Sequence, residues 1–304
     1  CWCEYGDGMD PDLEQAAHWY RQAADRGEEG AMFRLGLLYE RGEGVEQSWE
    51  QAAAWYQKAA EHGSPAGMGC LAWCYEHGAG TEKNLKESTR WYQRGAEAGS
   101  PRCMCDYGLH LLQGVGVRRQ PEEAVRWLLR AEEQGYSYAV FSLGWCSETG
   151  IGLPQDWGKA VERYQRAADL GEASAMKNLG LCYENGTGLP RDPKLAVQWY
   201  QKAAELGHAS AICLLGFCYK DGVGVSKDET RAAELFRQAA ELEDPDAMCT
   251  LGWCFETGCG VAQDWSQAAE WYRKAAECGS GRAMGNLAWC YDHGKGVEQD
   301  SEEA

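Results

Sequence analysis

One spacing recurs along the whole chain, and it constrains the fold more than any other feature. A Leu-Gly pair or a close variant returns every 36 residues without insertion or deletion: Leu35-Gly36, Leu71-Ala72, Tyr107-Gly108, Leu143-Gly144, Leu179-Gly180, Leu215-Gly216, Leu251-Gly252 and Leu287-Ala288. Self-similarity at such a period is the signature of repeat architectures. The sequence therefore predicts a single continuous array over residues 1–304.

Each repeat is predicted to contain two helices. In one unit, Met68, Leu71 and Cys74 have the spacing of one helix face, and Gly78 follows as a helix terminator. The second helix begins after a capping Asp, Ser or Asn in every unit except one, where Gln120 precedes Pro121. Such a pair cannot bury its apolar faces alone, so the units must stack into a solenoid.

The turn that follows the second helix also has a regular signature. A glycine occupies this position in seven units, at Gly27, Gly63, Gly99, Gly135, Gly171, Gly207 and Gly279. Glycine adopts the left-handed conformation that ends a helix without a steric penalty. Glu243 replaces it once, so we expect that turn to be less well formed.

The stretch AMFRLGLLYERGEGVEQSWEQAAAWYQKAAEHGSPA, residues 31–66, resembles a Sel1-like repeat, a relative of the tetratricopeptide repeat. The resemblance covers essentially the whole chain. It implies an all-α fold, a right-handed α-solenoid superhelix of about eight helix-turn-helix repeats, with the first helices lining the concave side. It also implies a non-enzymatic protein-protein interaction scaffold or adaptor. Because residue 1 falls inside a first helix and residue 304 inside a second, we expect a fragment of a longer protein, truncated mid-repeat at both ends.

Six of the fifteen cysteines share one phase of the repeat, in the interior of the first helix: Cys74, Cys146, Cys182, Cys218, Cys254 and Cys290. Other units have Leu38 and His110 there, which favours buried thiols over disulfides or metal ligands. Neighbours at this phase should lie roughly 10 Å apart, and Cα atoms more than about 7 Å apart cannot form a disulfide. The chain contains no Cys-x-x-Cys motif.

The resemblance bears on localisation as well. The cysteine-rich secreted branch of Sel1 proteins pairs a cysteine late in the second helix with one early in the next helix. The matching residues here are Ala60 and Met68, and likewise at two further units, so these positions cannot pair. This difference favours a reducing compartment, and we expect a cytoplasmic protein, although an upstream signal peptide stays open.

Other candidate sites are explained by the repeat. His77 and His293 fall at a phase that is otherwise polar, so we expect solvated residues and no metal. The glycine-rich turns follow helices and lack the Gly-Lys-Ser/Thr of a phosphate-binding loop. We therefore expect no cofactor and no catalytic set. A net charge of −18 argues against nucleic-acid partners, and the absence of a long apolar run argues against membrane insertion.

One face of the first helix is not required for stacking. It carries what we call the aromatic row, Trp73, Trp145, Phe217, Trp253 and Trp289, with Leu37, Leu109 and Leu181 at the same phase. Beside it runs the acidic row, Glu76, Glu148, Glu184 and Glu256, to which Glu40 and Asp292 also belong. Exposed Trp residues often dominate protein interfaces, and carboxylates attract basic partners.

We therefore predict that these two rows bind a peptide or protein segment, basic and apolar in character. Three alternatives remain at this stage. The aromatic row could instead pack between neighbouring first helices. The repeats could belong to a longer protein with a hydrolase-type activity, or they could form a purely structural spacer.

Overall fold

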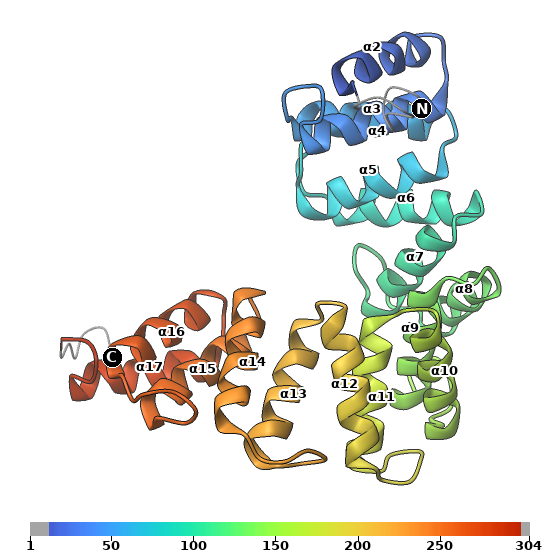
Figure 1. The fold of residues 1–304 in the computed structure, drawn as a ribbon. Coiled ribbons are helices and arrows are strands. Elements are labelled where there is room, and N and C mark those ends of the chain that lie inside the picture. Colours follow the sequence, from blue (N-terminus) through green and yellow to red (C-terminus); the bar gives the residue numbers. More distant parts are fainter. Residues whose placement is uncertain (1–11, 299–304) are drawn as a thin grey trace. The chain divides into compact units, whose positions relative to one another are not determined.

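The computed structural model describes residues 12–298, and this part of the chain contains helices and no strands. The chain divides into two compact units that meet between Asp156 and Trp157. The first unit contains α2 (Leu13–Ala24), α3 (Glu29–Arg41), α4 (Trp49–Glu61), α5 (Pro65–His77), α6 (Leu85–Glu97), α7 (Pro101–Gln113), α8 (Pro121–Glu133) and α9 (Ser137–Thr149) (Figure 1).

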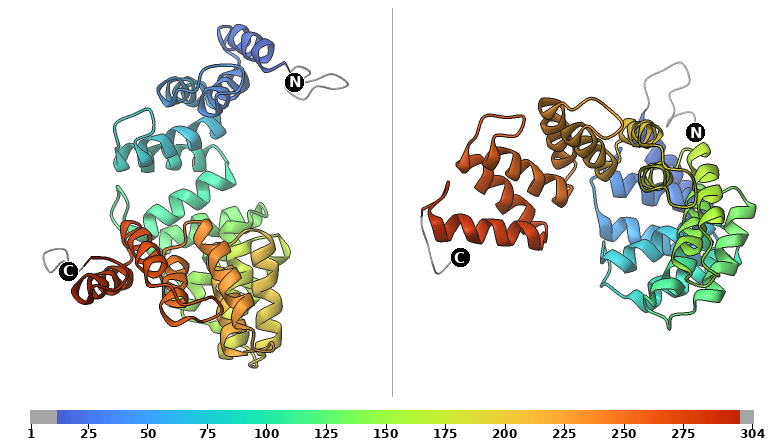
Figure 2. Two further views of the ribbon diagram at one scale, coloured as in Figure 1. Left: turned by 60° about the vertical axis from the view of Figure 1, so that its left-hand side comes forward. Right: turned by 90° about the horizontal axis from the view of Figure 1, so that it is seen from below.

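The second unit contains α10 (Trp157–Asp169), α11 (Ala173–Asn185), α12 (Pro193–Glu205), α13 (Ala209–Asp221), α14 (Glu229–Glu241), α15 (Pro245–Thr257), α16 (Trp265–Glu277) and α17 (Gly281–His293). Within each unit every helix packs against the next one along the chain (Figure 2). We call the odd-numbered helices, which open each repeat, A helices, and the even-numbered ones B helices. The predicted all-α solenoid of helix pairs is confirmed.

The turn from an A helix to the following B helix makes contact with the preceding repeat. Helix α5 ends at Gly78, which has a φ of 75° and donates its N–H to the Cys74 carbonyl. Two residues later, Gly80 has a φ of 68°. A Cβ atom on Gly80 would lie 2.0 Å from the carbonyl oxygen of Trp49, at the start of α4. Glycine therefore lets each turn press directly on the backbone of the repeat before it.

Within each unit the core lies between neighbouring A and B helices. A buried B-helix ring covers a glycine on the A helix, and a Cβ atom on Gly36 would lie 2.5 Å from the Tyr56 ring. The cysteine phase lies in this core, as the sequence predicts, with every member at most 4% exposed. Burial raises the pKa of the Cys74 and Cys218 thiols to about 12.

The B helices begin as the sequence predicts. Side-chain oxygens accept hydrogen bonds from the first turn at Ser48, Asn84, Asp192, Asp228 and Asp264. Gln120 makes no such bond, and Pro121 occupies the first helical position behind it. The cap predicted at Asp300 lies outside the described residues.

Glu243 occupies the turn that the sequence predicts to be less well formed. Its backbone has a φ of 59°, the left-handed conformation that the glycines adopt in other repeats. The N–H of Glu243 still bonds the Ala240 carbonyl at 3.0 Å, and the N–H of Asp244 bonds the Ala239 carbonyl at 3.3 Å. The Asp244 bond is longer than the 2.9–3.2 Å of the equivalent bonds in the other repeats, and Glu243 is held in a strained conformation, so this turn is less well formed, as expected.

Replacing Glu243 by glycine should therefore stabilise the second unit. Removing the left-handed strain of a non-glycine residue stabilises the fold by about 1–2 kcal/mol. Part of this gain is lost because glycine has more conformational freedom in the unfolded chain. We expect Glu243→Gly to raise the free energy of unfolding by about 0.5–1 kcal/mol, measured by urea unfolding. A destabilised variant would show that the Glu243 side chain makes a favourable contact outweighing the strain.

Candidate protein-interaction surface

The aromatic row lies on the A helices with differing exposure. Trp145, Trp253 and Trp289 are 37%, 36% and 43% exposed. Trp73 and Phe217 are half-buried. Most large apolar side chains elsewhere on the A helices are buried. The structure thus leaves three tryptophans of this row uncovered on the A-helix face.

Trp73 belongs to a local stack. Its ring lies 5.4 Å from the Trp49 ring and 4.3 Å from the His77 ring. The Nδ1 atom of His77 donates to the Trp73 carbonyl at 3.0 Å, because a carbonyl oxygen can only accept. Trp265, Trp289 and His293 repeat this arrangement, with ring distances of 5.5 and 4.3 Å. The near-identical segments LAWCYEHGAG and LAWCYDHGKG therefore encode the same aromatic stack.

The acidic row is engaged in the fold. Glu76 accepts a hydrogen bond from the Tyr92 hydroxyl at 3.2 Å, and Glu184 accepts one from Tyr200 at 2.6 Å. Tyr56 donates to Glu40 and Tyr272 donates to Glu256 in the same way. Burial is the main reason that the pKa of each of these hydroxyls is raised, and the carboxylate beside it adds to the effect. These glutamates therefore accept hydrogen bonds from buried tyrosines within the fold itself.

The sequence contains a signal for this pairing that the sequence analysis missed. Each tyrosine follows its glutamate by 16 residues. Where the acidic position is Leu112, the tyrosine position is Leu128; where it is Lys220, the tyrosine position is Phe236. The carboxylate therefore changes together with the hydroxyl that needs it, as expected for a structural pair.

The A-helix face of the first unit has an apolar pocket of about 240 Å³ between α7 and α9. Its lining residues are Leu109, Leu112, Gln113, Tyr138, Phe141, Ser142 and Trp145. The Ser142 hydroxyl is occupied, since it donates to the Tyr138 carbonyl at 2.7 Å. This pocket is suited to an apolar side chain.

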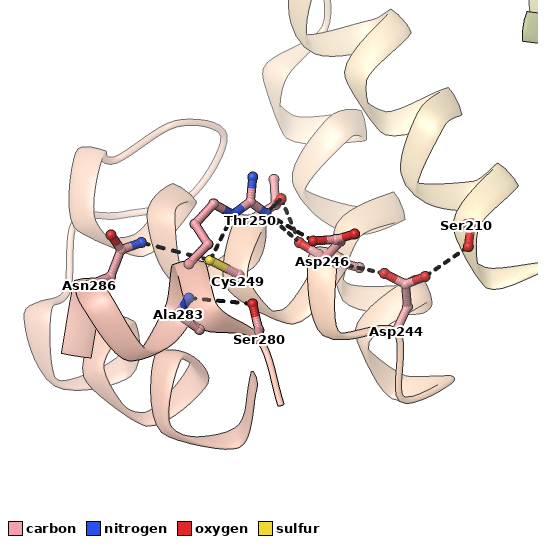
Figure 3. A network of polar contacts seen from close by, with 10 residues as sticks. Ser210, Asp244, Asp246, Cys249, Thr250, Ser280, Ala283 and Asn286 are labelled. Carbon is pink, nitrogen blue, oxygen red and sulfur yellow. Dashed lines mark hydrogen bonds and ion pairs between the residues drawn. The ribbon is translucent and has the colours of Figure 1, made fainter. Parts of the chain in front are cut away.

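The A-helix face of the second unit has two adjoining pockets of 320 and 220 Å³, which share Phe217 and Arg282. The larger reaches Ser210 and Asp244, which are 3.0 Å apart through a hydroxyl-to-carboxylate hydrogen bond (Figure 3). The smaller reaches Trp253. Together they form a groove beside the aromatic row, lined by both cations and carboxylates.

A buried polar cluster lies at the one unit whose cysteine position is a histidine. His110 is 5% exposed, and its Nδ1 atom lies 2.7 Å from the Thr89 hydroxyl. Its Nε2 atom lies 3.5 Å from a Glu76 oxygen. Burial lowers the pKa of His110, so the neutral ring is favoured. The His110 ring and Thr89 are enclosed in the core, which indicates a structural role.

Asp106, on α7, is another polar residue within the first unit. Burial raises the pKa of its carboxyl to about 6, although Arg102 lies 3.8 Å away. A carboxyl whose pKa is raised on folding stabilises the protein below its unfolded value of 3.8, and that contribution is lost as the pH rises through about 6.

We therefore expect Asp106→Asn to stabilise the first unit at neutral pH but not at pH 4. The shift of about two pKa units, which already includes the opposing effect of Arg102, corresponds to a gain of at most about 2–3 kcal/mol. The measurement is urea unfolding of both proteins between pH 4 and pH 7.5. An equal effect of the substitution at every pH would contradict the raised pKa.

The described residues contain no group of three or more His, Cys, Asp or Glu side chains placed to hold a metal ion. No helix between residues 12 and 298 has the length and apolar character needed to cross a membrane. The exposed tryptophans and the pockets described above lie on the A helices of each unit.

Stacked helix pairs with a free helix face define the class of α-solenoid repeat proteins. The family model of the Sel1 repeat matches residues 1–28, 30–64, 67–100, 101–136, 137–172, 173–208, 209–244, 245–280 and 281–304. The chain belongs to the Sel1-repeat family, whose members generally act as protein-interaction scaffolds. No curated protein matches its sequence.

Two solved structures illustrate the likeness. A protective antigen of uropathogenic Escherichia coli strains with an SLR fold is 28% identical, with a TM-score of 0.62 over 99% of this chain and 72% of that one. A Sel1 repeat protein from Oxalobacter formigenes is 29% identical, with a TM-score of 0.68 over 75% of this chain and 96% of that one. Yeast Tom70, at 12% identity and a TM-score of 0.57, shares the fold alone.

Proposed function

We propose that the chain is a non-enzymatic adaptor that binds a linear segment of a partner protein along the A-helix face. The observation that carries this proposal is the exposure of Trp145 on an A helix of the first unit and of Trp253 and Trp289 on A helices of the second. Large aromatic side chains in such positions usually anchor an interface. Trp73 and Phe217 complete the row, and the neighbouring pockets would receive partner side chains.

The acidic row has a supporting role in this proposal. Its carboxylates first position buried tyrosines, and Glu76 keeps a side chain that is 30% exposed. Together with the net charge of −18, they attract partners with basic residues and speed their encounter. A partner segment that is predominantly basic and apolar fits this surface.

The test compares three versions of the array for capture of partners from a lysate of the organism that expresses it. One is the wild type, and one carries Trp145→Ala, Trp253→Ala and Trp289→Ala. The third is a matched control with Leu170→Ala, Leu206→Ala and Leu242→Ala, because these leucines are 49–56% exposed at the ends of B helices. Circular dichroism should show that all three are equally helical.

We expect the control to retain the partners of the wild type and the tryptophan variant to lose them. Hot-spot residues contribute about 2 kcal/mol or more each, so three of them should reduce affinity at least a hundredfold. If only the leucine variant loses the partners, the binding site lies at the turns between repeats. If the wild type captures no partner, a purely structural spacer is favoured.

We further propose a reducing, cytoplasmic location, because most of the described cysteines are free thiols buried in the A helices. To test this location, the protein is taken directly from cells, unfolded and alkylated, and the number of modified cysteines is measured by mass spectrometry. Every cysteine should be modified without prior reduction. Cysteines that need a reductant first would place the chain in an oxidising compartment.

A further inference from the structure

The smaller pocket of the second unit differs chemically from the apolar pocket of the first. It lies on α13, α15 and α17, and six of its lining residues are Phe217, Lys220, Thr250, Trp253, Arg282 and Asn286. Two of them are cations and two are aromatic, and no carboxylate lines it. We call this 220 Å³ depression the cationic pocket.

Lys220 brings a positive charge to a position that is acidic in other repeats. Its ammonium nitrogen lies 5.3 Å from the Phe217 ring centre and 5.1 Å from the Trp253 ring centre, and the side chain is 23% exposed. The Asp221 carboxylate lies 3.4 Å from this nitrogen, but it is 55% exposed and does not line the pocket, so it neutralises the charge only in part. Since Phe236 has no hydroxyl group to satisfy, this repeat does not need a carboxylate at position 220.

Arg282 forms the second positive wall and is fixed in place. Its guanidinium donates to the Asp246 carbonyl at 3.1 Å, the Thr250 hydroxyl at 3.3 Å and the Cys249 sulfur at 3.2 Å (Figure 3). The Asp246 carboxylate is 3.7 Å away and 83% exposed, so it neutralises the charge only in part. Asn286 adds an amide donor 3.7 Å from the Cys249 sulfur. Arg282 and Asn286 are thus held against α15 before a ligand binds.

We infer that the cationic pocket binds the carboxylate of an Asp or Glu side chain in the partner segment, with an adjacent apolar side chain of that segment packed against Trp253. Charge complementarity is the argument, because two cations and an amide converge on one cavity of suitable size. This inference rests on the proposed function.

The rest of the molecule makes this pocket selective. With a net charge of −18, the array repels strongly acidic segments. A segment with one acidic residue among basic and apolar neighbours fits both surfaces. Its basic residues are attracted by the net negative charge of the array, and its acidic residue is attracted by the cationic pocket.

The test uses a display library of short peptides of random sequence, held between fixed flanks so that neither terminus is free. The library is selected on the wild type and on the Lys220→Glu variant. Glutamate occupies the equivalent position in four other repeats, at Glu76, Glu148, Glu184 and Glu256. The matched control is Lys194→Glu, which makes the same charge change at an exposed position on α12.

Peptides selected on the wild type and on Lys194→Glu should share an Asp or Glu beside an apolar residue. Changing that residue to Gln or Asn, or changing Lys220 to Glu, should weaken their binding about tenfold or more. Lys220→Glu should itself select Lys or Arg at this position.

Two outcomes contradict the inference, and only the second also contradicts the proposed function. If selected peptides depend on Trp253 but have no acidic residue in common and bind Lys220→Glu equally well, the inference is wrong and the proposed function stands. If no selected peptide depends on Trp145, Trp253 or Trp289, both are overturned.

Discussion

Gly80→Ala should destabilise the first unit by about 2–5 kcal/mol. Its Cβ atom would lie 2.0 Å from the Trp49 carbonyl oxygen, a distance that backbone atoms cannot accept. Overpacking of this kind costs about 1–3 kcal/mol or more, and the φ of 68° adds about 1–2 kcal/mol for a residue with a side chain. Urea unfolding followed by circular dichroism measures the effect.

Gly99→Ala is the matched control for that measurement. Gly99 has a φ of 92°, but nothing lies within 4 Å of the position of its Cβ atom. Only the conformational penalty applies there, so we expect a loss of about 1–2 kcal/mol. Equal losses for the two variants would show that the turn does not press on the preceding repeat.

The second large effect concerns the tyrosine–glutamate pairs. Tyr200→Phe removes a 2.6 Å hydrogen bond to Glu184 and should cost about 1.5–2 kcal/mol. Glu184→Leu leaves the buried Tyr200 hydroxyl without its acceptor and should cost about 2–3 kcal/mol. The double variant should be about 1–2 kcal/mol more stable than the sum of the single losses predicts.

Phe236→Tyr provides the control for this cycle. It places a hydroxyl group on the B helix of the repeat where Lys220 occupies the acidic position. A lysine cannot accept a hydrogen bond, so no stability should be gained. Strictly additive losses at Tyr200 and Glu184 would show that these two residues do not act as a pair.

The sequence predicts the fold well because the repeat makes each position visible many times. The capping residues, the turn glycines and the buried cysteine phase all recur, so each assignment is supported by several units. At Glu243 the local preference for glycine at positive φ is overridden, and the turn persists with a strained residue and a longer hydrogen bond. Tertiary contacts decide such cases, and the turn position alone does not show them.

The candidate site is less predictable because exposure depends on neighbours. The aromatic row is a single phase of the repeat, yet Trp73 stacks on Trp49 while Trp145 remains open. The acidic row follows from the sequence, but its use by tyrosines on another helix does not follow from the A helix alone. Only comparing two phases across repeats, as at Lys220 and Phe236, could have shown it.

Oxidative footprinting of the tryptophans tests the central claim most directly. Hydroxyl radicals oxidise exposed tryptophan rings, and the modified sites are read by mass spectrometry with and without a captured partner. We predict that Trp145, Trp253 and Trp289 become protected when the partner binds. Trp19, which is 56% exposed on B helix α2, should be oxidised equally in both samples. Unchanged oxidation of the three A-helix tryptophans in a saturated complex would contradict binding at this face.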